Sequence, residues 1–281
     1  MIWLSSYPKS GNTWVRVFLD NLRSGSDQPV DINHISISRI ASSRTLFDQY
    51  TGVNSSDLND DEIERNRPQV YRLMASETTE DIVLKVHDAW KLTSNKETLF
   101  PQEITKAVVY IIRNPLDVAV SSAFHNSVSF EVSTKRLNSN QSLCEKKDRL
   151  YNQLRQNLQS WSKHVVSWVD KSGLPLLVVR YEDLVDDPVR NFSAIVNFLD
   201  WPFDMDRIVK AIDNCEIEKL RKQEMEKGFR EKPIKAELFF RSAKPGNWAK
   251  YLSDELIRSI CNSNKSVMDR FGYSAKNPCI L

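Results

Sequence analysis

Short apolar runs rich in β-branched residues alternate along this chain with stretches of helical periodicity. Four runs predict β-strands, at residues 2–6, 82–86, 107–112 and 174–179. The third, AVVYII, is almost continuously apolar, as expected of a strand that is covered on both faces. Because strands that alternate with helices pair in parallel through right-handed crossovers, the pattern predicts an α/β fold built on a central parallel β-sheet flanked by helices.

Two segments between the strands have helical spacing. Apolar positions from Trp14 to Leu22 predict a helix directly after the first strand. A second set recurs at spacings of four, three, four and three, at Leu154, Leu158, Trp161, Val165 and Trp168. It predicts one amphipathic helix through all five positions that ends before Gly173. Residues 23–81 and 126–150 are polar and break this rhythm, and we keep open whether they are lids, acceptor-binding loops or solvated insertions.

The composition is that of an ordinary globular protein. Of the 281 residues, 41% are hydrophobic and 27% are charged, which is enough for a single domain over residues 1–281. The 39 basic and 37 acidic residues nearly cancel, so overall charge predicts no nucleic-acid partner and no membrane surface. No run is long enough to cross a bilayer and no signal peptide is visible, so we expect a cytoplasmic protein. The cysteines are scattered, which fits a reducing compartment and predicts no metal site: Cys144, Cys215, Cys261 and Cys279.

The most informative motif is YPKSGNTW at residues 7–14, between the first predicted strand and the first predicted helix. The first backbone N–H groups of a helix lack partners inside it, and their dipoles attract anions. Lys9 adds a positive charge, and Ser10 and Thr13 add hydroxyl donors. A strand, a small-residue turn with a lysine, and a helix therefore predict a site for a phosphorylated ligand.

The order of residues in this loop differs from the common P-loop, in which the lysine follows the last glycine of G-x-x-x-x-G-K-[ST]. Here Lys9 precedes the single glycine. The loop resembles the 5′-phosphosulfate loop, Y-P-K-[ST]-G-[TN]-[TN]-W, of the sulfotransferases that use 3′-phosphoadenosine 5′-phosphosulfate (PAPS). This resemblance implies that six loop residues bind PAPS: Lys9, Ser10, Gly11, Asn12, Thr13 and Trp14.

Further motifs of the same family follow in the family's order. RNPLDVAVS, residues 113–121, resembles R-[ND]-P-x-D-x-x-x-S, which implies that Arg113 and Ser121 hold the 3′-phosphate. The rigid fork of a guanidinium suits that task. The segment RYEDL implies that Tyr181 contacts the adenine. FFRSAKPGNW, residues 239–248, resembles the family's C-terminal loop R-K-G-x-x-G-[DN]-W and implies nucleotide contacts from Phe240, Arg241, Ser242 and Ala243.

The chain departs from the family pattern in two places. Ser242 and Ala243 replace the usual lysine and glycine of the C-terminal loop, which removes one ammonium that pairs with phosphate. Our hypothesis is that Lys244 supplies a replacement charge. Residues 215–217, with the sequence CEI, stand where the family has the T-S-F nucleotide contacts.

Catalytic roles follow from KVHD at residues 85–88, which resembles the K-x-H catalytic segment of the family. An unperturbed histidine has a pKa of about 6.5 and can take a proton at pH 7, so His87 is the predicted general base. Lys85 lies two residues earlier on the same face of the strand and is predicted to hold the transferring sulfonate. Lys9 would neutralise the departing phosphate, and Ser121 would tether the nucleotide and restrain Lys9.

The positions of the polar side chains predict one shared site. One side chain follows each of the four predicted strands: Lys9, His87, Arg113 and Tyr181. Functional groups gather at the carboxyl ends of parallel strands, so we expect these four to lie together. The remaining histidines occur in no matching motif and are predicted to be structural: His34, His125 and His164.

The resemblance covers nearly the whole chain and implies a P-loop NTPase-like, three-layer sulfotransferase fold. It implies an enzyme that moves a sulfuryl group from PAPS to a hydroxyl or amine of a small-molecule acceptor and releases PAP, without a metal. Two alternatives stay open. A P-loop-like nucleotide kinase or NTPase is disfavoured, because Arg113 follows the third strand where a metal-binding carboxylate is needed. The other is a catalytically inactive nucleotide-binding module. The sequence does not identify the acceptor, and a monomer and a homodimer are both compatible with it.

Overall fold

The computed structural model describes residues 1–145 and 150–273, so Cys279 lies outside the described residues. Its central sheet has five strands in the order β2-β3-β1-β4-β7, and every neighbouring pair is parallel. The strands are β1 (Ile2–Ser6), β2 (Ser38–Ile40), β3 (Val83–Val86), β4 (Ala107–Ile112) and β7 (Leu176–Arg180). The predicted parallel sheet is confirmed, and β2 is the strand that the sequence pattern missed.

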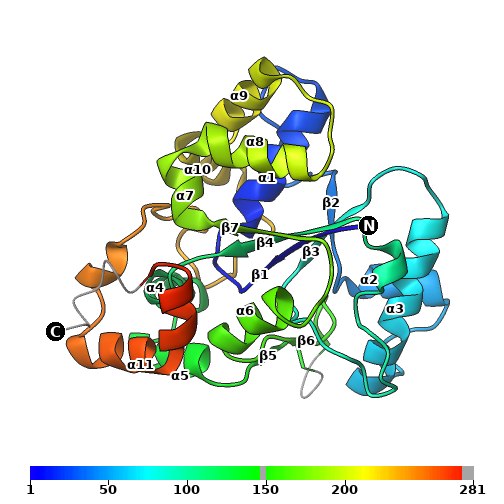
Figure 1. Cartoon of the computed structure of the whole chain (residues 1–281), viewed down its shortest axis with the longest axis horizontal. Helices are drawn as coiled ribbons and strands as arrows, with labels where there is room; N and C mark the ends of the chain where they lie inside the picture. Colours follow the sequence, from blue (N-terminus) through cyan, green and yellow to red (C-terminus); the bar gives the residue numbers. More distant parts are fainter. Residues whose placement is uncertain (146–149, 274–281) are drawn as a thin grey trace.

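Helices cover both faces of the sheet and give a three-layer molecule, as Figure 1 shows. The upper layer in that view contains α1 (Asn12–Ser24), α7 (Tyr181–Asp186), α8 (Pro188–Phe198), α9 (Met205–Asn214) and α10 (Ile217–Lys227). The lower layer contains α2 (Arg44–Thr51), α3 (Asp60–Ser76), α4 (Pro115–Asn126), α5 (Phe130–Asn138), α6 (Trp161–Val169) and α11 (Asp254–Arg270). Shorter elements are the antiparallel strand pair β5 (Ser142–Leu143) and β6 (Gln156–Asn157) and the 3₁₀ turns η1 (Gln102–Ile104) and η2 (Asn247–Lys250). No helix among the described residues is long and apolar enough to span a bilayer.

The alternation of side chains along β1 explains the two layers of core. Ile2 and Leu4 point into the cluster that α1 and α8 cover, whereas Trp3 points into the cluster on the opposite face of the sheet. All three side chains are fully buried. On the lower face Trp3 packs edge-on against Tyr71 and Phe100, with ring centroids 5.1 Å apart in both pairs. The apolar run at residues 2–4 of β1 is therefore the expected sequence for a strand that is covered on both sides.

The predicted amphipathic helix before β7 is shorter than its apolar spacing suggests. Leu154 and Leu158 are buried but lie outside α6, which begins only at Trp161. Ser160 is its N-cap, and the Ser160 hydroxyl accepts a hydrogen bond from the backbone N–H of Lys163. The helix ends at Val169, and Gly173 lies beyond it in the left-handed conformation. The first two apolar positions thus belong to an extended segment, and this part of the helix prediction is wrong.

The polar region 23–81 contains more regular structure than its pattern indicates, because it supplies β2, α2 and α3. A buried ion pair fastens α3 to the end of β3: Arg67 Nη2 lies 2.7 Å from Asp88 Oδ2, and both side chains are almost fully buried. The other carboxylate oxygen of Asp88 accepts a hydrogen bond from the backbone N–H of Asn157. This network fixes the turn that directly follows His87.

Candidate active site

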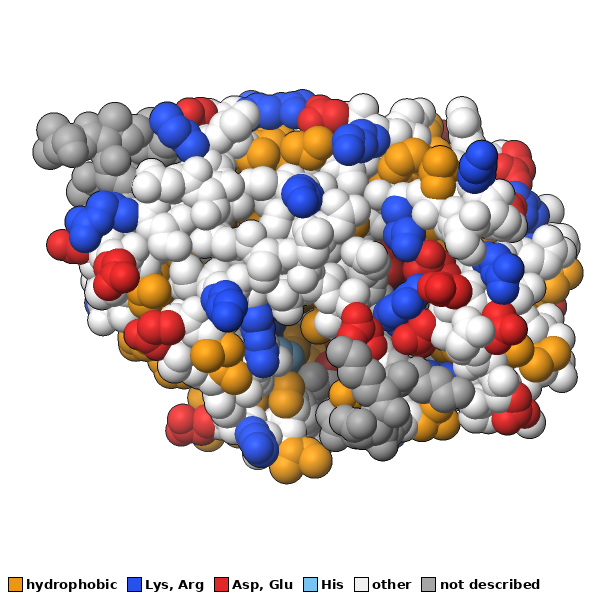
Figure 2. All heavy atoms as spheres, turned by 90° about the horizontal axis from the view of Figure 1, so that it is seen from below, with side chains coloured by type: hydrophobic (Ala, Val, Ile, Leu, Met, Phe, Trp, Pro, Cys, Tyr) orange, Lys and Arg blue, Asp and Glu red, His pale blue; other side chains and the backbone are white. Residues whose placement is uncertain are grey.

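A cavity of about 1400 Å³ opens where β1, β3, β4 and β7 end. One lining residue comes from the segment after each of these strands: Lys9, His87, Arg113 and Tyr181. Single small-ligand sites usually have volumes of roughly 300–1,000 Å³, so this cavity has room for two reactants. Figure 2 shows a hollow on one face of the molecule, with histidine atoms inside it and Lys and Arg side chains gathered along one side.

The loop between β1 and α1 closes tightly over the cavity. Gly11 is the N-cap of α1 and has a φ of 101°. A Cβ at this position would lie 2.5 Å from Cδ2 of Tyr181, so only glycine fits. Lys9 has a φ of 72°, a backbone conformation that residues with a Cβ adopt rarely and that is frequent at functional sites. The loop is therefore shaped for the cavity at some expense in backbone strain.

Lys9 is a half-buried lysine whose ammonium packs against aromatic rings. Its Nζ lies 3.1 Å from Nδ1 of His125, to which it donates, and 4.0 Å from the centroid of the Phe239 ring. Burial, with smaller contributions from the charges of Lys85 and Arg113, lowers the pKa of Lys9 to about 7. Within the described part of the chain no carboxylate forms an ion pair with Lys9. An anionic ligand would supply the missing counter-charge.

The sequence analysis assigned His125 a structural role, but in the structure this histidine lines the cavity. It sits on α4 four residues after Ser121, so the two share one face of the helix. Both line the cavity, and the contact that restrains Lys9 here comes from His125. Burial first, then the charge of Lys9, lowers the pKa of His125 to about 3, so its imidazole is neutral at pH 7.

His87 is held in the tautomer that a general base needs. Its Nδ1 lies 2.8 Å from the carbonyl oxygen of Ser6, and since a carbonyl only accepts, Nδ1 carries the proton and Nε2 keeps its lone pair. Behind it, Nε2 of His164 donates to the His87 carbonyl at 3.1 Å, and Nδ1 of His164 accepts from the Tyr110 hydroxyl at 2.8 Å. Burial first, then Lys85, lowers the pKa of His87 well below its usual value. His164 thus has the predicted structural role, and His34 lies on the surface outside the cavity.

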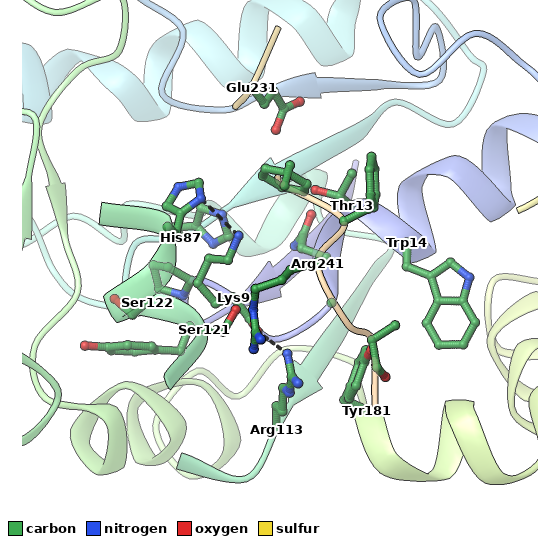
Figure 3. Close-up of a pocket in the computed structure, with 18 of the residues that line it drawn as sticks. Lys9, Thr13, Trp14, His87, Arg113, Ser121, Ser122, Tyr181, Glu231 and Arg241 are labelled. Carbon is green, nitrogen blue, oxygen red and sulfur yellow. Dashed lines mark hydrogen bonds between the residues drawn. The ribbon is translucent and has the colours of Figure 1, made fainter. Parts of the chain in front are cut away.

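Arg113 and Tyr181 form the end of the site beneath the loop. The Arg113 guanidinium stacks on the Tyr181 ring, with 4.3 Å from Cζ to the ring centroid, and donates to the Lys9 carbonyl at 3.1 Å. In Figure 3 these two residues lie at one end of the site, Lys9 lies in the middle, and His87 and Glu231 lie toward the other end. The Tyr181 hydroxyl donates to the carbonyl of Ala243 at 2.7 Å, which connects this end to the C-terminal loop.

The C-terminal loop reaches the cavity through Phe240, Arg241, Ser242 and Ala243. Arg241 lies over the Phe124 ring at 4.2 Å and donates to the Tyr251 hydroxyl at 3.3 Å. Ala243 has a φ of 54°, a left-handed conformation that explains why a glycine suits this position in the resembled family. Asp117 accepts from the backbone N–H groups of Gly246 and Trp248, so its carboxylate fastens this loop to the start of α4.

Lys85 has a partner that sequence reasoning did not predict. Its Nζ lies 2.7 Å from Oε2 of Glu231, and Oε1 of Glu231 lies 2.7 Å from Nη1 of Arg16. No motif or spacing in the sequence points to Glu231, which comes from an irregular segment far along the chain. His125, by contrast, was detectable from its helical spacing to Ser121.

Nearly all the predicted site residues line the cavity. Ser10 does not, although its hydroxyl is fully buried nearby. Among residues 215–217, Glu216 and Ile217 line the cavity, while Cys215 is buried and its carbonyl accepts from the Trp14 indole at 3.0 Å. No group of three or more potential metal ligands occurs among the described residues.

Comparison with known proteins identifies the family. A family model described as a sulfotransferase domain matches residues 1–272. The chain belongs to the sulfotransferase family. This sulfotransferase is 24% identical to a flavonol 4′-sulfotransferase of Flaveria chlorifolia over 92% of its own length and 76% of the relative's. It is 26% identical to cytosolic sulfotransferase 8 of Arabidopsis thaliana over 92% and 74% of the two chains.

Solved structures show the same fold. Mouse sulfotransferase SULT7A1, complexed with PAP, superposes with a TM-score of 0.63 at 17% identity, covering 98% of this sulfotransferase and 88% of that chain. Retinol dehydratase, in complex with androsterone and the inactive cofactor PAP, gives a TM-score of 0.62 at 19% identity, covering 95% and 80%. The predicted family and the predicted three-layer α/β fold are therefore confirmed.

Proposed function

We propose that this sulfotransferase moves a sulfuryl group from PAPS to a hydroxyl or amine of a small-molecule acceptor and releases PAP. Membership of the sulfotransferase family supports the reaction class. Relatives named as flavonol sulfotransferases and neighbours described as PAP complexes support the small acceptor and the nucleotide. Relatives named as cytosolic support a cytoplasmic location.

The residues of the site fit a nucleotide that carries two separate phosphate groups. The hydroxyl of Ser10 and Nε of Arg113 are buried and have no hydrogen-bond partner within the described residues. Buried donors without partners are destabilising unless a ligand satisfies them. The donor-binding residues we propose are Lys9, Ser10, Gly11, Asn12, Thr13, Trp14, Arg113, Ser121, Tyr181, Phe240, Arg241, Ser242 and Ala243. When bound, PAPS supplies the sulfuryl group that is transferred.

The protein's own groups have distinct tasks in this proposal. His87 accepts the acceptor's proton at Nε2, whose lone pair the Ser6 carbonyl leaves available by holding the proton on Nδ1. Lys85 holds the sulfonate oxygens with its ammonium, and Lys9 neutralises charge on the departing phosphate. Ser121 tethers the nucleotide from α4. Positively charged side chains thereby stabilise the negative charge that develops.

A single observation carries this proposal. One cavity contains both a lysine that has no carboxylate partner among the described residues, Lys9, and a neutral imidazole, His87, oriented with a free lone pair. A binding module has no need of such a base. A kinase or NTPase needs an acidic metal ligand after a strand, whereas Arg113 follows β4.

The test combines binding with turnover. Calorimetry on the purified protein is expected to give a clear PAP isotherm without magnesium and no comparable signal with ATP and magnesium. Labelled PAPS with a panel of flavonols, steroids, simple phenols and amines is then expected to yield a labelled acceptor. Tight ATP–magnesium binding without PAP binding would favour the kinase alternative, and PAP binding without transfer to any acceptor class would favour the inactive module.

A further inference from the structure

Glu231 is one of four acidic residues, with Asp117, Glu216 and Glu218, among the described residues that line the cavity, where Lys and Arg are more numerous. Glu231 lies between Lys85 on β3 and Arg16 on α1, with 2.7 Å to each nitrogen. In Figure 3 it lies toward the His87 end of the site, away from Arg113 and Tyr181. A negative charge here opposes an anionic donor unless it has a specific task.

The position of Glu231 is set by the backbone around it. It belongs to the connection between α10 and η2, residues 228–246. The backbone N–H of Arg230 donates to Asn33 Oδ1 at 2.8 Å, and Nδ2 of Asn33 donates to the Gly228 carbonyl at 3.0 Å. The neighbouring Phe229 ring packs against Phe239 at a centroid distance of 4.7 Å. Glu231 is therefore presented to Lys85 by an anchored segment.

Lys85 needs such a partner because it is buried among positive and neutral groups. Five charged or titratable side chains face Lys85. They are Arg16 from α1, Lys9 from the loop between β1 and α1, His87 after β3, His125 from α4, and Glu231. Burial lowers the pKa of Lys85, Arg16 lowers it further, and Glu231 is the group that opposes both. Burial acts to raise the pKa of Glu231, but Lys85 and Arg16 outweigh it and bring that pKa down to about 2, so the carboxylate stays ionised.

The ion pair with Glu231 uses only one of the hydrogen-bond donors of the Lys85 ammonium. A lysine ammonium has three N–H donors, and Glu231 accepts one of them. Two donors remain for sulfonate oxygens on the cavity side. A carboxylate that accepts one N–H can thus orient Lys85 and keep it protonated without blocking it.

We propose that Glu231 is a positioning residue for sulfuryl transfer, which holds the Lys85 ammonium charged and aimed at the transferring sulfonate. This inference rests on the proposed function of Lys85. It assigns Glu231 no contact with the donor or the acceptor. Its effect is expected on turnover, and not on binding of PAP, because PAP lacks the sulfonate that Lys85 holds.

The first experiment compares Glu231→Gln with Glu237→Gln. Glu237 lies on the same connection but is exposed and outside the cavity, which makes it a matched control. Glu231→Gln is expected to lower kcat at least about tenfold while the Kd of PAP changes less than about threefold, and Glu231→Asp is expected to recover part of the loss. Glu237→Gln is expected to behave as the unmodified protein. Equal losses of PAP binding and turnover in Glu231→Gln would make the residue structural, and a faster turnover would make it inhibitory; either result overturns the proposal.

The second experiment is a pH profile, which a purely structural role would not move. Without the carboxylate the pKa of Lys85 falls further. As pH rises, kcat of Glu231→Gln is therefore expected to begin falling at a lower pH than kcat of the unmodified protein. Adding Lys85→Arg is expected to remove this alkaline loss, because arginine stays protonated throughout. Identical profiles for the unmodified protein and Glu231→Gln overturn the proposal. If the unmodified protein itself binds no PAP and transfers no label, the proposed function fails instead.

Discussion

Binding of PAP is expected to weaken steeply as pH rises above 7, because Lys9 must take up a proton. In the protein without a ligand, burial lowers the pKa of Lys9 to about 7, so half of the Lys9 side chains are neutral at pH 7 and most are neutral at pH 8. A bound phosphate restores the pKa toward the ordinary value of about 10.4. The complex therefore holds a proton that the free protein lacks at alkaline pH.

The size of the effect follows from the pKa of Lys9. The Kd scales with one plus the ratio of neutral to charged Lys9, which is about 2 at pH 7, about 11 at pH 8 and about 101 at pH 9. The Kd of PAP should therefore rise about fivefold from pH 7 to 8 and about ninefold from pH 8 to 9. The total corresponds to about 2.3 kcal/mol. His125, with a pKa of about 3, is neutral throughout this range.

Isothermal calorimetry at constant ionic strength measures both the affinity and the proton. Titrations in two buffers of different ionisation enthalpy should show uptake of about 0.5 proton at pH 7 and about 0.9 at pH 8. Lys9→Arg is the control, since its guanidinium stays charged and the pH slope should vanish even if its affinity is lower. A flat profile for the unmodified protein would refute the reasoning. An unchanged slope in Lys9→Arg would assign the proton to another group, with Lys85 the first candidate because burial lowers its pKa too.

Three substitutions test other parts of the site and the fold. His87→Ala should reduce transfer by about 10²–10⁴-fold in a labelled-PAPS assay while PAP binding stays within about threefold; near-normal turnover would remove His87 from the mechanism. Arg113→Ala should weaken PAP by about 10–100-fold in calorimetry, as for the loss of charged hydrogen bonds, but should change an analogue without the 3′-phosphate much less; equal losses for both ligands would contradict its role. Asp88→Ala leaves the buried Arg67 guanidinium without its carboxylate and should lower the free energy of unfolding by about 3–5 kcal/mol in urea titrations; a loss below about 1 kcal/mol would show that the pair is not needed.

The sequence predicts the strands of the central sheet that contain an apolar run, including the partly exposed edge strand β7, and misses the strand that has none. β4 is apolar throughout and β1 is apolar at residues 2–4, because helices cover both sides of these strands. β2 is only three residues long, includes Arg39, and pairs with β3 alone at the edge of the sheet. A short polar edge strand carries no apolar pattern, so it could not be found from periodicity.

Two other differences have equally local reasons. The apolar spacing at Leu154 and Leu158 continues that of α6, yet these residues lie in an extended segment next to β6. Gln159 has a φ of 58° and Ser160 caps the helix, and these backbone features interrupt a helix without interrupting the burial. The apolar spacing therefore predicted correctly that Leu154 and Leu158 are buried, but it did not predict that their backbone is not helical.

The shared location of Lys9, His87 and Arg113 at one cavity was predictable, because each belongs to a motif that directly follows a strand. The partners of these side chains were mostly not predictable, because they come from distant elements. Phe239 reaches Lys9 from the segment before η2, and Glu231 reaches Lys85 from the same connection. No spacing rule links such positions before the chain is folded.

The partners that the fold supplies explain how a protein with a net charge of only +2 offers a concentrated positive site. Lys9 lies on the Phe239 ring, Arg113 on the Tyr181 ring and Arg241 on the Phe124 ring. Within residues 1–145 and 150–273 none of these three cations forms an ion pair. An aromatic face orients a cation with roughly 0.5–2 kcal/mol of attraction but adds no negative charge. A carboxylate in the same place would orient the cation and also neutralise it. The cations proposed to bind phosphate are therefore supported by rings. Lys85, which we propose stays protonated and points at the transferring sulfonate, is instead held by the carboxylate of Glu231.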